Sequence, residues 1–100
     1  MSEFRQAQIA RQINYRRTRN LYIMSALLEM FGMAKQHHII PSHCTEYEFT
    51  IVKTSDNDII CLGVEYWPTN KRTDQKIMAG IPRELQPMFN AYARRVIRYT

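Results

Sequence analysis

The chain has 100 residues, a formal net charge of +5 and 45% apolar residues. This length fits one domain, residues 1–100, and excludes a catalytic domain joined to a separate regulatory one, while the apolar fraction is too high for a disordered chain. No apolar run approaches the roughly 20 residues of a membrane-spanning helix, and the first residues lack the layout of a secretory signal, so we expect a cytoplasmic protein without a membrane segment.

Residues 3–36 are expected to be helical for most of their length. The segment contains no proline and only one glycine, Gly32, and its apolar side chains fall on one side of a helix wound at about 100° per residue. These apolar residues are Ile9, Ile13, Met24, Leu27, Leu28 and Phe31. One continuous helix would be about 50 Å long, too long for a domain with a radius of gyration of about 13 Å. We therefore expect the helix either to break near residues 18–20 or to project its first turns as an arm.

The next part of the chain predicts an antiparallel hairpin over residues 47–66. Residues 45–53 alternate between apolar and polar side chains, which is typical of a half-buried strand. The apolar members of this alternation are Tyr47, Phe49 and Ile51. A turn cluster at residues 55–58 (SDND) follows, and the run at residues 59–67 is apolar on both faces, as in a covered strand.

The chain is expected to close with a third strand and a helix. Residues 76–81 are a candidate strand before Pro82, which extends the sheet region to residues 45–81. Residues 83–99 carry apolar side chains at spacings of three and four, typical of a helix with one face on a sheet, and Pro87 fits in its first turn. The apolar residues of this helix are Leu85, Met88, Phe89, Tyr92, Val96 and Tyr99. The predicted fold class is α+β, with a long or broken N-terminal helix, an antiparallel hairpin or three-stranded sheet, and a C-terminal helix.

No constellation of residues predicts catalysis or a cofactor. Residues 37–44 (HHIIPSHC) hold three imidazoles and a thiol, but their neighbouring pairs point in different directions, whereas zinc ligands usually lie two to four residues apart. Solvated histidines at a helix end are the preferred interpretation, and a metal site in this cluster is the alternative. Cys44 and Cys61 are expected to be reduced, buried and inert. We expect no enzyme activity, no metal and no cofactor.

The arginine and tyrosine residues are the most informative candidates for binding. The positive net charge favours an anionic partner, either nucleic acid or an acidic protein surface. On one continuous helix Arg5, Arg16 and Arg19 would project within about 60° of one another. Such groups suit phosphates and bases, protein hot spots, or simply a solubilising surface. The candidate partner-binding residues are Arg5, Tyr15, Arg16, Arg19, Tyr22, Trp67, Pro68, Lys71, Arg72, Arg94, Arg95 and Arg98.

The only tryptophan, Trp67, precedes Pro68 at the end of a predicted strand. Its ring either packs in the core or stands exposed as an anchor for a partner. Peptide bonds before proline populate the cis form and isomerise slowly. A prolyl isomerase is therefore a candidate partner at Trp67-Pro68.

Three segments carry a resemblance to a known family. They are the arginine-rich opening at residues 11–17 (RQINYRR), the loop at residues 66–72 (YWPTNKR) and the tail at residues 93–99 (ARRVIRY). In size and in the order of these segments, the whole chain resembles the anti-RecBCD accessory proteins of lambdoid Salmonella phages. The resemblance implies a phage protein that binds the host RecBCD helicase-nuclease through its RecC subunit, protects linear phage DNA ends and favours phage recombination. It implies no catalytic or metal-binding residue.

A second hypothesis follows from the charge alone. The chain would then be a small basic nucleic-acid-binding regulator that uses its arginine-rich helices, with direct contact to nucleic acid. A homodimer formed through the long first helix is a further expectation, because its apolar stripe must be covered.

Overall fold

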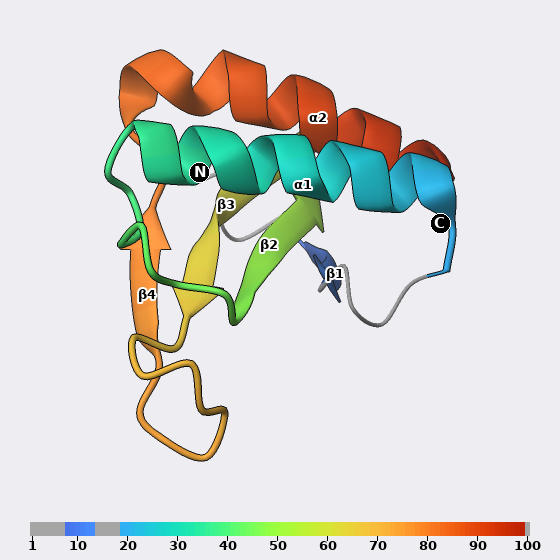
Figure 1. Ribbon diagram of the computed structural model, residues 1–100. Coiled ribbons are helices and arrows are strands. Elements are labelled where there is room, and N and C mark those ends of the chain that lie inside the picture. Colours follow the sequence, from blue (N-terminus) through green and yellow to red (C-terminus); the bar gives the residue numbers. More distant parts are fainter. Residues whose placement is uncertain (1–7, 14–18, 100) are drawn as a thin grey trace.

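The structure has two layers, with both helices on one face of an antiparallel sheet (Figure 1). The computed structural model describes the backbone of residues 8–13 and residues 19–99 in full. The sheet has the strand order β1-β2-β3-β4, and neighbouring strands are antiparallel. The elements are β1 (Gln8–Ile13), α1 (Leu21–Gln36), β2 (Tyr47–Lys53), β3 (Ile59–Tyr66), β4 (Ile77–Gly80), the short 3₁₀ helix η3 (Arg83–Leu85) and α2 (Gln86–Arg98). The predicted α+β fold class is confirmed.

The first helix is shorter than predicted, because α1 begins only at Leu21. The side-chain oxygen of Asn20 accepts hydrogen bonds from the backbone N–H groups of Tyr22 (3.0 Å) and Ile23 (3.4 Å). Asparagine is a preferred cap, since its short side chain reaches the free N–H groups of the first turn. The start of α1 therefore coincides with the boundary predicted near residues 18–20.

The predicted helix over residues 3–36 is wrong for residues 8–13, which form β1. This strand pairs with β2 in a register that starts with Gln8 opposite Lys53. The segment contains no proline or glycine, so either conformation is open to it. Pairing with the free edge of β2 outweighs helix propensities that differ by less than about 1 kcal/mol per residue. With α1 reduced to 16 residues, the long helix that suggested a helix-mediated homodimer is not found in the part of the chain that the structure describes.

The predicted hairpin over residues 47–66 is confirmed, with Tyr47 opposite Tyr66 across β2 and β3. The candidate strand at residues 76–81 is also confirmed, as β4, and it pairs with β3. The sheet therefore contains one strand more than predicted, which is β1.

The core lies between the helices and the covered face of the sheet. The Phe49 ring stands edge-on to Tyr47, with centroids 5.5 Å apart, and lies 6.4 Å from the ring of Phe89 on α2. The predicted C-terminal helix is confirmed with Pro87 in its first turn, although Met88 and Tyr99 are exposed instead of facing the sheet. Fully buried members of the core are Ala26, Leu27, Met30, Ala34, Phe49, Ile51, Cys61, Phe89, Ala93 and Val96. Among the described residues, no helix combines the length and apolar character needed to cross a membrane.

A bulge in β3 is hydrogen-bonded to side chains of α2. Thr50 pairs with Gly63 and Ile51 with Cys61, so Leu62 is an extra residue in β3. The Cys61 N–H donates to the side-chain oxygen of Asn90 (2.9 Å), and the Cys61 carbonyl accepts from the Gln86 side-chain amide (2.6 Å). Side chains of α2 thus satisfy backbone groups that the irregular strand presents to it, and they fix the bulge in place.

Gly63 is required by the close approach of β4, and this gives a testable contrast with Gly80. A Cβ at Gly63 would collide with the backbone carbonyl oxygen of Ala79, whereas a Cβ at Gly80 would meet open space. We expect Gly63→Ala to lower the free energy of unfolding by about 1–3 kcal/mol. Gly80→Ala should leave it unchanged or raise it by up to about 1 kcal/mol. Urea denaturation of both variants measures the difference, and equal midpoints would contradict the assigned strand contact.

Candidate protein-contact surfaces

The ends of the two helices form an exposed aromatic surface, which we call the helix-end patch (Arg19, Leu21, Tyr22, Arg98 and Tyr99). The start of α1 lies beside the end of α2 (Figure 1), and the Asn20 side-chain amide donates to the backbone carbonyl oxygen of Tyr99 (3.2 Å). The rings of Tyr22 and Tyr99 are stacked, with centroids 4.7 Å apart and an interplanar angle of 17°. Leu21 is 76% exposed, Tyr22 65% and Tyr99 41%.

The chemistry of the helix-end patch suits contact with another protein. The two tyrosine rings stack on each other, and exposed Leu21, Arg19 and Arg98 are close to them in the sequence. Tyrosine and arginine are enriched among residues that dominate binding energies at protein interfaces. Because the rings already stack on each other, little side-chain freedom remains to be lost when a partner binds.

The structure brings together only some of the predicted partner-binding residues. Arg19, Tyr22 and Arg98 lie at the neighbouring ends of α1 and α2, whereas Arg5, Tyr15 and Arg16 lie outside the described residues. The prediction that Arg5, Arg16 and Arg19 share one face of a continuous helix is wrong, because β1 interrupts that helix.

Arg94 and Arg95 lie on the exposed face of α2, as predicted, and each has an acidic neighbour. Arg94 is 3.6 Å from Asp58, and Arg95 donates to Glu29 over 3.0 Å. These exposed pairs contribute little to stability. The Arg95 guanidinium also lies over the half-buried Tyr92 ring, 5.5 Å from its centroid. Because both arginines already have these partners within the chain, they are weaker candidates for a protein contact than Arg19 and Arg98.

Trp67 is buried, so the interpretation of an exposed anchor is wrong and the alternative of core packing is correct. Its ring is 7% exposed and is covered by the Arg72 guanidinium, 4.3 Å from the ring centroid. The next residue, Pro68, is half-buried, and its carbonyl oxygen accepts a hydrogen bond from the His43 ring (2.7 Å). Binding of a prolyl isomerase at the Trp67-Pro68 bond stays a prediction. The isomerase would have to contact Pro68 and the exposed Lys71 without contacting the tryptophan ring.

Arg72 is held within the molecule by two carboxylates. Its Nε is 3.2 Å from Glu46 and its Nη1 is 2.6 Å from Glu48. Burial opposes the charge of Arg72, but the hydrogen bonds to Glu48 and Glu46 favour it, and the net effect raises the pKa of the guanidinium. Together with its stacking on Trp67, this arrangement makes Arg72 a clamp on the loop after β3 and not a free binding group.

The interactions of Arg72 with Glu46, Glu48 and Trp67 are expected to contribute about 1–3 kcal/mol to the free energy of unfolding. Arg72→Ala should lower the free energy of unfolding by that amount, because two partly buried carboxylates lose their guanidinium and Trp67 loses its cover. Arg72→Lys keeps the charge without the planar fork and should recover only part of the loss. Chemical denaturation followed by tryptophan fluorescence measures both effects. A lysine variant as stable as the natural chain would show that charge alone suffices.

The histidine and cysteine residues form no site. His37, His38 and His43 are exposed, whereas Cys44 and Cys61 are buried free thiols, as predicted for both cysteines. No group of three or more histidine, cysteine, aspartate or glutamate side chains within the described residues is arranged to hold a metal. Burial raises the pKa of Cys44, and it raises the pKa of Cys61 to about 12. Both thiols are therefore uncharged and poorly nucleophilic at neutral pH.

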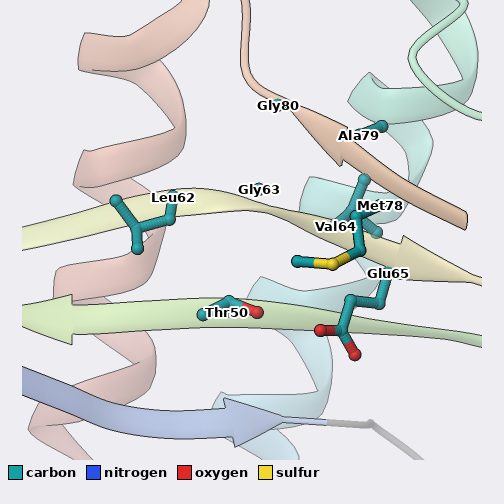
Figure 2. A pocket seen from close by; sticks show the side chains of 8 residues that line it. All are labelled: Thr50, Leu62, Gly63, Val64, Glu65, Met78, Ala79 and Gly80. Atoms are coloured by element: carbon teal, nitrogen blue, oxygen red, sulfur yellow. The ribbon is translucent and has the colours of Figure 1, made fainter.

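A shallow cavity of about 170 Å³ lies on the face of the sheet opposite the helices (Figure 2). Leu62, Met78 and Glu65 stand around it, and the backbone between them carries glycines. The complete lining is Thr50, Leu62, Gly63, Val64, Glu65, Met78, Ala79 and Gly80. No pattern in the sequence predicted this cavity, although isolated glycines in predicted strands are a sign of bulges and close backbone approach.

The comparisons with known proteins give no further constraint on these surfaces. No family model, no curated protein and no solved structure matches the chain.

Proposed function

We propose that this chain is a phage protein that binds the RecBCD helicase-nuclease in the host cytoplasm, through the RecC subunit, without catalysing a reaction itself. Binding protects linear phage DNA ends and favours phage recombination. The family resemblance of residues 11–17, 66–72 and 93–99 supports the identity of the partner. The helix-end patch supports the mode of action, which is contact with a protein surface.

The stacked pair of Tyr22 and Tyr99 is the observation that carries the proposal. Exposed aromatic side chains with a neighbouring exposed leucine, Leu21, are unfavourable in water unless a partner covers them, and a preorganised pair binds with a small entropic loss. The basic character of the chain argues against imitation of DNA, because a competitor for the DNA site of a nuclease would carry negative charge. The protein therefore acts by binding to the enzyme and not by occupying its DNA site.

The proposal is tested with purified RecBCD and the purified chain. We expect a stable complex by size-exclusion chromatography and slower degradation of linear duplex DNA when the chain is present. A subcomplex without RecC should fail to bind. Absence of a complex with the complete enzyme, at concentrations where the chain is folded, would exclude the proposal.

A nucleic-acid-binding regulator is the second candidate, favoured by the net charge of +5 and by exposed Arg19 and Arg98. A salt titration separates the two candidates. Binding to phosphates weakens steeply with salt, by about one power of the salt concentration for each phosphate neutralised. Binding to an aromatic protein interface should weaken far less. Retention of DNA with a steep salt dependence, and no retention of RecBCD, would favour this second candidate.

A further inference from the structure

The cavity on the open face of the sheet exists because two glycines lie opposite each other. Gly63 of β3 pairs with Gly80 of β4, so neither strand places a side chain there. The bulge residue Leu62 and the long side chains of Met78 and Glu65 stand around this floor (Figure 2). At about 170 Å³, the space is close to the roughly 150 Å³ of an engineered apolar cavity that holds benzene. One apolar side chain fills such a space.

The cavity adjoins a free edge of the sheet. β4 is the last strand in the sheet order, so no strand of the described residues pairs with its outer side. Its side chains are unusually apolar for an exposed edge, since Ile77 is 45% exposed and Met78 73%. Edge strands normally carry charges or prolines that prevent further pairing. β4 has neither, and no strand of the described residues prevents another strand from pairing with its outer side.

We propose that β4 and the cavity form a docking groove for an extended segment of a partner protein. The segment adds to β4 as a further strand, and a side chain of the size of leucine, methionine or phenylalanine enters the cavity over Gly63 and Gly80. In this mode of recognition the main-chain hydrogen bonds provide affinity and the side-chain pocket provides specificity. The inference does not rest on the proposed function, because the groove lies on the layer opposite the helices.

The charges around β4 define the chemistry of the segment. Lys76 precedes the strand and Arg83 follows it shortly, and both are exposed. Lys76 is partly neutralised by Glu65, 3.0 Å away, whereas Arg83 has no ion pair among the described residues. A complementary segment is therefore apolar in its centre and carries an acidic residue at the end that lies beside Arg83.

The test uses labelled synthetic peptides of about nine residues with alternating valine and threonine, acidic residues at both ends, and leucine, methionine, phenylalanine or glycine in the centre. Fluorescence polarisation measures affinity, and NMR locates the contact. We expect the three apolar peptides to bind and to shift the backbone amide signals of β4. The glycine peptide should bind about tenfold more weakly or worse, because nothing fills the cavity.

A matched pair of protein variants locates the binding to the cavity. Gly80→Phe fills the cavity from within, where an added Cβ meets no other atom, and should weaken the apolar peptides about tenfold or more. Gly32→Phe makes the same change at an equally open position on α1, across the molecule, and should bind like the natural chain. The comparison of peptides with different central residues uses only the natural chain. It therefore shows whether the cavity takes part in binding even if Gly80→Phe folds poorly.

Three outcomes would overturn the proposal. The first is that none of the apolar peptides binds. The second is equal affinity for the leucine and glycine peptides, because the cavity would then play no part. The third is that the β4 amide signals shift with protein concentration alone, because the groove would then be occupied by a second copy of the chain.

Discussion

The free energy of unfolding is expected to fall by about 2 kcal/mol between roughly pH 8 and pH 10.5 through Cys61 alone. The thiol is fully buried in the core, and desolvation raises its pKa from the ordinary 9.0 to about 12. The pKa of Cys61 is higher in the folded chain than in the unfolded chain. The stabilising contribution of the buried thiol is therefore fully present below pH 9 and is lost as the pH rises towards 12. Across the whole window, the loss approaches about 4 kcal/mol, from about 1.4 kcal/mol for each unit of pKa difference.

The measurement is chemical denaturation across this pH range for the natural chain and for Cys61→Ala. Tyrosine and lysine side chains also titrate at alkaline pH, but they do so in both proteins, so the difference between the two profiles isolates the thiol. Cys61→Ala should start less stable at neutral pH and lose less stability on the way to pH 10.5. Cys44→Ala is the second control and should keep the Cys61 dependence. Parallel profiles for the natural chain and Cys61→Ala would contradict the assignment.

The elements that were predicted correctly depend on local patterns. The alternation around Phe49, the turn cluster at residues 55–58 and Pro87 in the first turn of α2 each report a backbone conformation directly, and the structure agrees at all three. β1 was missed because its conformation depends on the free edge of β2, which is distant in the sequence. Helix propensity within residues 8–13 contains no information about that edge.

The surfaces were predicted only in part, for a related reason. Arg19, Tyr22 and Arg98 were recognised as binding-type residues, but that the helix ends carrying them are neighbours follows from the antiparallel packing of α1 and α2. Tyr99 was expected on the sheet face of the last helix, and it stacks on Tyr22 because the helix ends there. Trp67 was left open between core and surface. The burial of its ring follows from the Arg72 clamp, which no local pattern indicates.

Loss of both rings of the helix-end patch is expected to weaken the proposed complex with RecBCD about 100-fold or more. Exposed tyrosines that anchor an interface each contribute about 2 kcal/mol or more when removed. Because Tyr22 and Tyr99 hold each other in place, each single change to alanine also loosens the remaining ring. The double variant should therefore weaken binding by less than the sum of the two singles, with a coupling of about 0.5–1.5 kcal/mol. Equilibrium titration of the four proteins against RecBCD gives this cycle.

The controls must separate loss of the patch from loss of the fold. Both rings are exposed, so Tyr22→Ala and Tyr99→Ala should each change the free energy of unfolding by no more than about 1 kcal/mol. Met78→Ser removes an apolar side chain that is more exposed than either tyrosine, from the opposite layer, and should bind RecBCD like the natural chain. If the double tyrosine variant binds with full affinity, the helix-end patch is not the contact surface. If Met78→Ser alone weakens the complex, RecBCD uses the open face of the sheet, and the groove at β4 becomes the place where it binds.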